Sequence, residues 1–364
     1  MKTPTPRLLL PALVLLGLLP SATDARADTV VYVSESKDNR IAVFSLDESS
    51  GDLTRLGETP MEGAPGCLAV STDQKFLYAA VRSASQFATL AIHPDTGLLT
   101  PVGTSPAVGS AAYVFPDRTG NWLLGAYYGE GLVSVSRIAD GVVTGEPVCV
   151  LDIGKKAHCI QTDPANHFAF CPHPVDLNRV DQFRFDEKTG QLSLNDPPAM
   201  IAGENHGPRH LQFHPNGKWV YVVNEQGKSV TLCDYDAEKG TLAMRQTLST
   251  HPSDWDNTQG SCADIEISAD GRFVYASNRG HDSIAAFAID QSNGELTSLG
   301  QTPTEKTPRS FNLIPGGETF MVAAGQGSAK LVVYRRDPKS GAISPLKTYD
   351  CGQSPAWVMG LKLK

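Results

Sequence analysis

Residues 236–242 read Asp-Ala-Glu-Lys-Gly-Thr-Leu: an acidic residue, a glycine four positions later, then an apolar residue. This pattern or a close variant recurs at seven places, namely Asp47, Asp95, Asp140 (shortened), Asp186, Asp236, Asp290 and Asp337. The successive spacings are 48, 45, 46, 50, 54 and 47 residues. Self-similarity at such a period is the signature of a repeat architecture, in which each repeat is one structural unit. The sequence therefore predicts seven units.

A second series of turn signals lies between these repeats. Its members are Asp73, Asp117, Asp163, Asn216, Asp270 and Gly316. An apolar, β-rich run follows each turn, as at Phe76–Tyr78 and Phe273–Tyr275. Short strands at even spacing, separated by Asp, Gly and Pro turns, are typical of a β-propeller with one four-stranded blade per repeat. We expect an all-β fold, a seven-bladed β-propeller of four-stranded antiparallel blades.

The first blade lacks its innermost strand. Counting back one repeat from Asp73 reaches Asp28 and the strand Thr29–Val33, and no strand precedes it in the mature chain. The segment Pro355–Lys364 at the other end is unpaired and rich in strand-forming residues. Pairing the two ends would remove the exposed edges of an open ring. We therefore expect the N- and C-terminal strands to close the propeller.

Residues 1–27 have the pattern of a secretory signal peptide. Its three parts are a basic start (Lys2 and Arg7), an apolar run of 12 residues (Leu8–Leu19) and a small-x-small cleavage site (Ala25-Arg26-Ala27). The alternative is a membrane anchor, but a spanning helix needs about 20 apolar residues. We expect cleavage near Ala27/Asp28, a single propeller domain over residues 28–364, and export to the periplasm or the exterior.

Composition limits the partners. The formal net charge is −8, and no basic run or basic–aromatic stripe interrupts it. Nucleic acid is therefore disfavoured as a partner, and so is a membrane for the mature form. The seven cysteines contain no Cys-x-x-Cys pair, which disfavours a redox motif or a zinc ribbon. We expect no metal or other cofactor, while the disulfide pairing and the oligomeric state stay open.

Strand parity sorts the connections onto two faces. With strands A to D counted from the channel outward, the A–B and C–D turns share one face, and the B–C loops and D–A links share the other. Strand A lines the channel, so residues just before A or just after B surround its mouth. These residues are Tyr127, Tyr128, His158, Arg209, Glu225, Asp264, Arg279, Arg309 and Gln326. Their Arg, His and carboxylate groups indicate a small-ligand site, with Asp264, Arg309, Tyr127 and Gln326 as substrate contacts.

The densest part of this ring is residues 207–225, GPRHLQFHPNGKWVYVVNE. Together with Ala263–Ile265 and Ser277–Arg279, it resembles the seven-bladed propeller lactonase family. That family includes a bacterial 6-phosphogluconolactonase and the fungal carboxymuconate-lactonizing enzyme, and the resemblance covers the whole mature chain. The resemblance implies a catalytic set of one His, two Arg and one Glu, which falls on His158, Arg209, Glu225 and Arg279. The signal-peptide pattern departs from the phosphosugar lactonase, which acts in the cytoplasm.

These residue types suit lactone opening. A base, here Glu225 or His158, would activate water. One arginine would stabilise the oxyanion, and a second would bind a carboxylate or phosphate on the substrate. We expect a hydrolase that opens a sugar-type lactone, a small-molecule substrate, without a metal. Two alternatives stay open: a carboxymuconate-type lactonizing cycloisomerase, or a non-enzymatic propeller that binds a small anion or a protein.

Several of these residues also have purely structural interpretations. Arg209 could tie neighbouring blades together, Glu225 could simply pair with it, and Asp264 could brace a strand. The spacing of His206, His210 and His214 could suggest zinc, but these residues straddle a link, a strand and a turn rather than one helix face. The insertion Ser249–Gly260, with Trp255, is expected on the same face as the ring, where it could cover the site.

Overall fold

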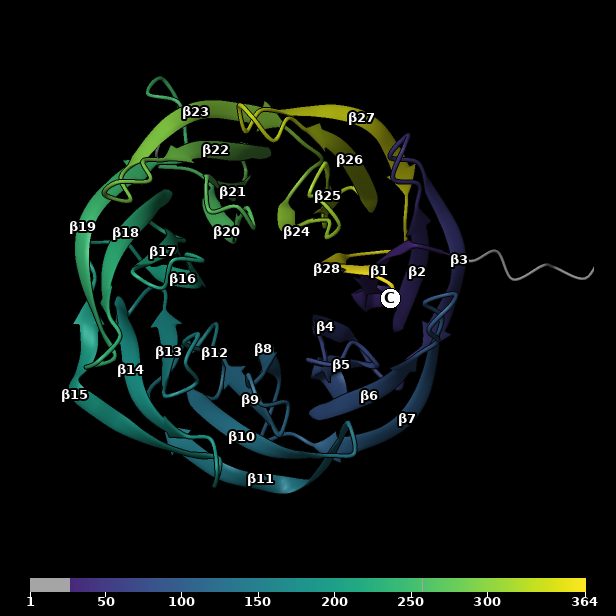
Figure 1. The fold of residues 1–364 in the computed structure, drawn as a ribbon, viewed down its shortest axis with the longest axis horizontal. Coiled ribbons are helices and arrows are strands. Elements are labelled where there is room, and N and C mark those ends of the chain that lie inside the picture. Colours follow the sequence, from purple (N-terminus) through teal and green to yellow (C-terminus); the bar gives the residue numbers. More distant parts are fainter. Residues whose placement is uncertain (1–26, 257) are drawn as a thin grey trace, which may run out of the picture.

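The computed structural model describes residues 27–256 and 258–364 as seven four-stranded antiparallel sheets arranged around a common axis (Figure 1). The described part also contains two 3₁₀ helices, η1 (Ser36–Asp38) and η2 (Arg82–Ala84). The predicted seven-bladed propeller is thereby confirmed. The signal-peptide pattern lies outside the described residues except for Ala27. In the described part, no helix is long and apolar enough to span a membrane.

Each blade runs from an innermost strand at the channel to an outermost strand at the rim. Blade 1 comprises β28 (Pro355–Lys362), β1 (Thr29–Glu35), β2 (Arg40–Leu46) and β3 (Leu53–Pro60). Blade 2 comprises β4 (Pro65–Val70), β5 (Phe76–Val81), β6 (Gln86–Ile92) and β7 (Leu99–Pro106). Blade 3 comprises β8 (Ala111–Pro116), β9 (Trp122–Tyr127), β10 (Leu132–Ala139) and β11 (Val142–Asp152). Blade 4 comprises β12 (Gln161–Thr162), β13 (Phe168–His173), β14 (Arg179–Asp186) and β15 (Gln191–Ile201).

The remaining three blades follow the same order. Blade 5 comprises β16 (Pro208–Phe213), β17 (Trp219–Asn224), β18 (Ser229–Asp236) and β19 (Thr241–Ser249). Blade 6 comprises β20 (Ser261–Ile267), β21 (Phe273–Arg279), β22 (Ser283–Ile289) and β23 (Leu296–Pro303). Blade 7 comprises β24 (Pro308–Leu313), β25 (Phe320–Gly325), β26 (Lys330–Arg336) and β27 (Ile343–Asp350).

Blade 1 is built from both ends of the chain. β28 is its innermost strand and pairs antiparallel with β1, from Thr29 opposite Lys362 to Glu35 opposite Pro355. Figure 1 shows the yellow C-terminal strand beside the purple N-terminal one. The closure predicted from the missing first strand is therefore confirmed, and each of the seven blades has four strands.

The acidic residue of the repeat organises the C–D turn. In blade 5, Asp236 Oδ1 accepts hydrogen bonds from the backbone N–H groups of Glu238 (3.1 Å) and Lys239 (3.0 Å). The N–H of Gly240 donates to the Asp236 carbonyl at 2.7 Å. A short acceptor that bonds to its own backbone two residues later is what makes Asp a turn residue. The recurrence of Asp in the sequence therefore reflects the same turn in successive blades.

The glycine of the repeat is required for two reasons. Gly190 and Gly294 have φ of +72° and +81°, a region that residues with a Cβ avoid. A Cβ at Gly190 would lie 2.7 Å from the Trp122 ring of the preceding blade, and a Cβ at Gly294 would lie 2.5 Å from the Trp219 ring. These two C–D turns thus pack against the first residue of strand B in the blade before them. This contact joins the blades into one body.

All seven cysteines lie in the described part and none forms a disulfide. Six are buried, and Cys351 is half-buried. Burial raises the pKa of Cys262 to about 11 and that of Cys159 to about 12. These thiols therefore act as small apolar groups that fill the blade cores.

Candidate active site

Side chains from three consecutive blades meet at the end of the channel formed by the D–A links and B–C loops. Arg209 is the second residue of β16, Glu225 directly follows β17, and Arg279 ends β21. Arg309 is the second residue of β24. Because strands A and B are antiparallel, the start of A lies beside the end of B. The alternating direction of the strands therefore places these residues at one edge of the ring.

Glu225 connects two of the arginines. Its Oε2 atom lies 3.1 Å from Arg209 Nε, and its Oε1 atom lies 2.9 Å from Arg279 Nη2. The Arg209 side chain is 2% exposed, whereas those of Glu225 and Arg279 are each 17% exposed. Arg209 also donates through Nη1 to the carbonyl of Ala263, and Arg279 donates to that of Cys262 at 2.7 Å. The network is thus anchored to β20.

Positive charge outweighs negative charge in this network. Burial would raise the pKa of Glu225, but the charges of Arg209 and Arg279 hold it below its ordinary value. Burial, with the charges of Arg309 and Arg279, lowers the pKa of Arg209 to about 9. Burial, with the charges of Arg279 and Arg82, lowers that of Arg309 to about 10. Guanidinium groups stay charged at neutral pH, so this end of the channel favours an anion.

His158 lies in the link before β12 and is 5% exposed. It lines a narrow cavity with Arg82, Arg209, Arg309 and Trp357. The cavity leaves ≈ 10 Å³ for the centre of a water molecule, which corresponds to about one water. The Nδ1 atom of His158 is buried and makes no hydrogen bond within the described residues. Burial, and then the charge of Arg209, hold the pKa of His158 well below its ordinary value, so the imidazole is neutral at pH 7.

Two of the expected substrate contacts have other partners. Asp264 is buried, and its Oδ1 atom lies 2.8 Å from His210 Nδ1. Tyr127 is fully buried inside blade 3, where its hydroxyl lies 2.9 Å from Ser134 Oγ. Tyr127 therefore departs from the predicted ring, because its side chain enters the blade core instead of the channel.

The predicted contact Gln326 and the ring residue Tyr128 remain at the D–A and B–C face. Gln326 follows β25 and is half-buried, and its backbone N–H donates to the Thr307 carbonyl at 2.9 Å. The Tyr128 ring packs edge-on against His158, with ring centroids 5.5 Å apart. Tyr128 thus packs against His158, whereas Gln326 lies in the loop after β25.

Known proteins share this fold and a substantial part of this sequence. Residues 35–359 match the model of the family described as Lactonase, 7-bladed beta-propeller. The chain belongs to this lactonase family. The resemblance seen in the sequence motifs is thereby confirmed.

The relatives cover nearly the whole chain. The 6-phosphogluconolactonase of Pectobacterium carotovorum is 36% identical over 338 residues, which cover 92% of this chain and 99% of that protein. The 6-phosphogluconolactonase of Yersinia pestis is 33% identical, with coverages of 90% and 96%. The solved structure of the periplasmic gluconolactonase of Pseudomonas aeruginosa superposes with a TM-score of 0.82 at 25% identity, covering 92% of this chain and 99% of that one.

In this member of the lactonase family, the structure adds residues that sequence reasoning did not select. Arg82 directly follows β5 and lines the cavity beside His158. The rule that selected Arg279, position just after strand B, also applies to Arg82. Trp357 comes from the closing strand β28 and lines the same cavity. A strand from the far end of the sequence thus contributes to the site.

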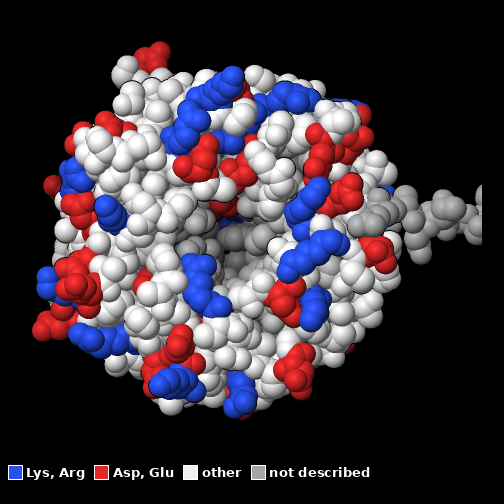
Figure 2. Space-filling model, viewed as in Figure 1, with Lys and Arg blue, Asp and Glu red and all other residues white. Residues whose placement is uncertain are grey.

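Four rings divide the channel of this lactonase-family propeller. The centroid distances are 5.0 Å for His158–His210, 5.3 Å for Tyr113–His210 and 5.5 Å for Tyr113–Trp357. Below these rings, toward the A–B turns, lies a second cavity of ≈ 350 Å³. It is lined by Glu266, whose pKa is raised by burial and then by the charge of Asp264 to about 8. A hollow with charged side chains at its edge is visible at the centre of the ring (Figure 2).

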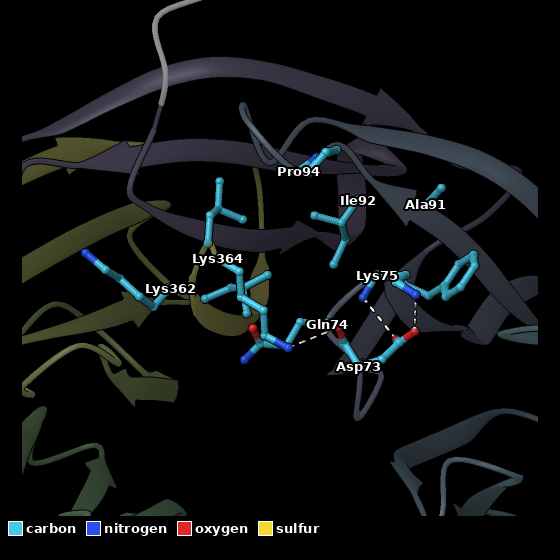
Figure 3. A pocket seen from close by; sticks show the side chains of 11 residues that line it. Asp73, Gln74, Lys75, Ala91, Ile92, Pro94, Lys362 and Lys364 are labelled. Atoms are coloured by element: carbon cyan, nitrogen blue, oxygen red, sulfur yellow. Dashed lines mark hydrogen bonds and ion pairs between the residues drawn. The ribbon is translucent and has the colours of Figure 1, made fainter.

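A further cavity of ≈ 650 Å³ lies where the end of β28 meets the β4–β5 turn. Its labelled side chains include Asp73, Lys75, Ile92 and Lys364 (Figure 3). Lys75 pairs with Asp73 at 3.3 Å. This cavity contains none of the predicted site residues. We therefore place the candidate site at the cavity beside His158.

The insertion after β19 lies on the expected face. Its Trp255 packs edge-on against His281, with centroids 4.6 Å apart, and His281 belongs to the B–C loop that follows Arg279.

The side chains of the histidine series do not meet at one point: His210 bonds Asp264, and His214 Nε2 lies 2.8 Å from the Gly271 carbonyl. In residues 27–256 and 258–364, no group of three or more His, Cys, Asp or Glu is arranged to hold a metal ion.

Proposed function

We propose that this protein hydrolyses the lactone of an anionic sugar acid at the cavity beside His158. The observation that carries the proposal is a space for a single water lined by three arginines and one neutral imidazole. Glu225 joins one of these arginines, Arg209, to Arg279. Membership of the lactonase family and two relatives called 6-phosphogluconolactonases support it. A neutral ligand would leave most of the arginine charge at the mouth uncompensated.

The arginines divide into two roles. Arg209 and Arg279 are held by Glu225 and by backbone carbonyls, so they are suited to a fixed oxyanion site. Arg82 and Arg309 line the cavity beside them. Their planar donor forks suit a carboxylate or a phosphate. We assign them to the anionic group of the substrate.

His158 is the better base for water. Both carboxylate oxygens of Glu225 are engaged by guanidinium groups. His158 is neutral at pH 7 and its buried Nδ1 has no partner in the described part. The water oxygen forms a bond to the lactone carbonyl carbon while its proton passes to His158. The ring C–O bond then breaks, and the departing oxygen takes that proton, giving the hydroxy acid.

We also propose that the mature protein is an exported domain of residues 28–364. The sequence pattern of residues 1–27 supports export, and the Pseudomonas aeruginosa relative is a periplasmic gluconolactonase. The Asp28 carbonyl accepts a hydrogen bond from the N–H of Leu363 at 2.8 Å. Cleavage at this point would preserve the ladder that closes the ring.

A panel of lactones tests the proposal. Acid release is followed on gluconolactone, 6-phosphogluconolactone and a carboxylated muconolactone, each corrected for spontaneous hydrolysis. We expect turnover of a sugar lactone, and a loss of about a hundred- to ten-thousandfold in kcat/KM for His158→Gln. Turnover of the muconolactone alone would assign the cycloisomerase reaction instead. No turnover of any lactone by folded protein would refute the enzymatic proposal.

A further inference from the structure

His210 lies directly behind Arg209, between that arginine and Asp264. Its Nε2 atom is 3.2 Å from Arg209 Nη1, and its Nδ1 atom is 2.8 Å from Asp264 Oδ1. All three residues are buried: Arg209 is 1% exposed, His210 3% and Asp264 5%. The three groups thus form a row from the carboxylate through the imidazole to the guanidinium.

The hydrogen-bond partners of His210 determine which of its two ring nitrogens carries the proton. A guanidinium has donors only, so the His210 Nε2 that faces Arg209 must offer its lone pair. The proton of the neutral ring is then on Nδ1, where it is donated to Asp264. Burial, and then the charge of Arg209, lower the pKa of His210 to about 4, in agreement with a neutral ring at pH 7. A single tautomer satisfies both contacts.

The carboxylate at the end of the row is itself held. Asp264 Oδ1 accepts from the N–H of Ile265 at 3.1 Å, and its Oδ2 accepts from the N–H of Phe311 at 3.4 Å. The Asp264 N–H donates to Ser277 Oγ at 3.0 Å. Asp264 is thereby fixed to strands of blades 6 and 7. Asp264 lines the second cavity of the channel and not the cavity beside His158.

Packing prevents the His210 ring from turning. It contacts Tyr113 and His158 edge-on, with centroids 5.3 and 5.0 Å apart, and lies 5.9 Å from Trp357. Arg209 Nη1 is occupied by His210 and by the Ala263 carbonyl, and Nε faces Glu225. Within the described residues, Arg209 Nη2 makes no hydrogen bond, and the residue lines the cavity beside His158.

We propose that Asp264 and His210 are positioning residues that set the orientation of Arg209, so that its remaining edge meets the substrate. The proposal rests on the proposed function only in that Arg209 acts on a lactone. Asp264 fixes the tautomer of His210, and His210 accepts from Nη1 without adding a charge. A group that holds a ligand-binding arginine within a fraction of an ångström affects rate without touching substrate.

The same substitution at two histidines tests this proposal. His210→Phe keeps a ring in the channel but removes the acceptor, whereas His210→Gln keeps an acceptor in its amide oxygen. His214→Phe is the matched control, since His214 is also buried, lies four residues further along the chain and bonds only outside the site. We expect kcat/KM of His210→Phe to fall by up to about a hundredfold, with partial recovery in His210→Gln and no change in His214→Phe. Equal activity of folded His210→Phe and wild type would overturn the proposal.

Two further measurements do not depend on turnover. Nitrogen NMR of the wild-type protein should show His210 as the neutral Nδ1–H tautomer at pH 7, and a proton on Nε2 would overturn the proposal. Arg209 lines the same cavity as Arg82 and Arg309, so a misoriented Arg209 should weaken the binding of inorganic phosphate. Titration should therefore give weaker binding for His210→Phe than for His214→Phe, and equal affinities would overturn the proposal. If wild type opens no lactone, the proposed function fails, while the tautomer and the phosphate titration still decide the role of His210.

Discussion

Replacing Glu225 with Gln should destabilise the protein at neutral pH. The amide keeps the shape of the side chain, but Arg209 and Arg279 lose their shared counter-charge at 3.1 and 2.9 Å. Removing one partner of a buried ion pair costs about 3–5 kcal/mol. Because the Glu225 side chain is 17% exposed, water replaces part of the lost interaction. We expect the free energy of unfolding to fall by about 2–4 kcal/mol.

The loss of unfolding free energy caused by Glu225→Gln should become smaller as the pH falls. The pKa of Glu225 in the folded protein lies below its ordinary value, which is about 4.3 in an unfolded chain. A depressed carboxyl pKa stabilises the folded state above the unfolded value, and this contribution disappears as the pH falls through the folded value. At low pH the wild-type carboxyl is protonated and resembles the amide. The difference between wild type and Glu225→Gln should therefore be full at pH 7 and should narrow below pH of about 4.3.

Urea unfolding at pH 7 and at pH of about 3.5, monitored by circular dichroism, measures the difference in unfolding free energy between wild type and Glu225→Gln at each pH. The control is Glu58→Gln, because Glu58 also pairs with two arginines but its side chain is 43% exposed. Exposed pairs contribute about 0–1 kcal/mol, so the control should change little. If Glu225→Gln cost no more than Glu58→Gln, or if its cost were the same at both pH values, the described charge network would not be what stabilises this end of the channel.

Three other predictions concern export, closure and blade packing. Mass spectrometry of protein secreted from a compatible host should give a mature N-terminus at or near Asp28, and an intact leader on membrane-bound protein would contradict the cleavage. Deleting residues 355–364 removes the innermost strand of blade 1, so the truncated protein should aggregate or melt far lower; unchanged melting would place closure elsewhere. Gly294→Ala forces a Cβ to 2.5 Å from the Trp219 ring at φ +81° and should cost about 2–5 kcal/mol. Gly217→Ala, at φ +69° with open space around it, should cost only about 1–2 kcal/mol in the same thermal and urea unfolding experiments.

The blades could be predicted because each repeat carries its own turn chemistry. An Asp that bonds its own backbone and a glycine at positive φ are local requirements, so they recur in the sequence wherever the turn recurs. The convergence of Arg209, Glu225 and Arg279 was also predictable, since strand parity fixes which ends of strands share a face. The second inference uses only the alternation of strand direction, and neither inference requires knowledge of side-chain contacts.

Side-chain direction was harder to predict. Tyr127 ends β9 at the correct face, yet its ring enters the blade core, because successive residues of a strand point to opposite sides. The partner of Asp264 is 54 residues away in the neighbouring blade. The repeated sequence pattern does not show how neighbouring blades are aligned with each other. The contact of Asp264 with His210 was therefore not predicted. Such pairings depend on how blades pack, which local sequence does not encode.

The shared sheet of β28 and β1 also has a consequence for how the protein is made. The 320 positions that separate Glu35 from Pro355 must be synthesised before blade 1 can acquire its innermost strand. At roughly 5–20 residues per second, this takes about 16–64 s, during which β1 has no inner neighbour and Trp357 is absent from the cavity beside His158. The ring and the candidate site are therefore completed by the same late segment, β28. For the proposed export, this order means that most of the chain is translated before the ring can close.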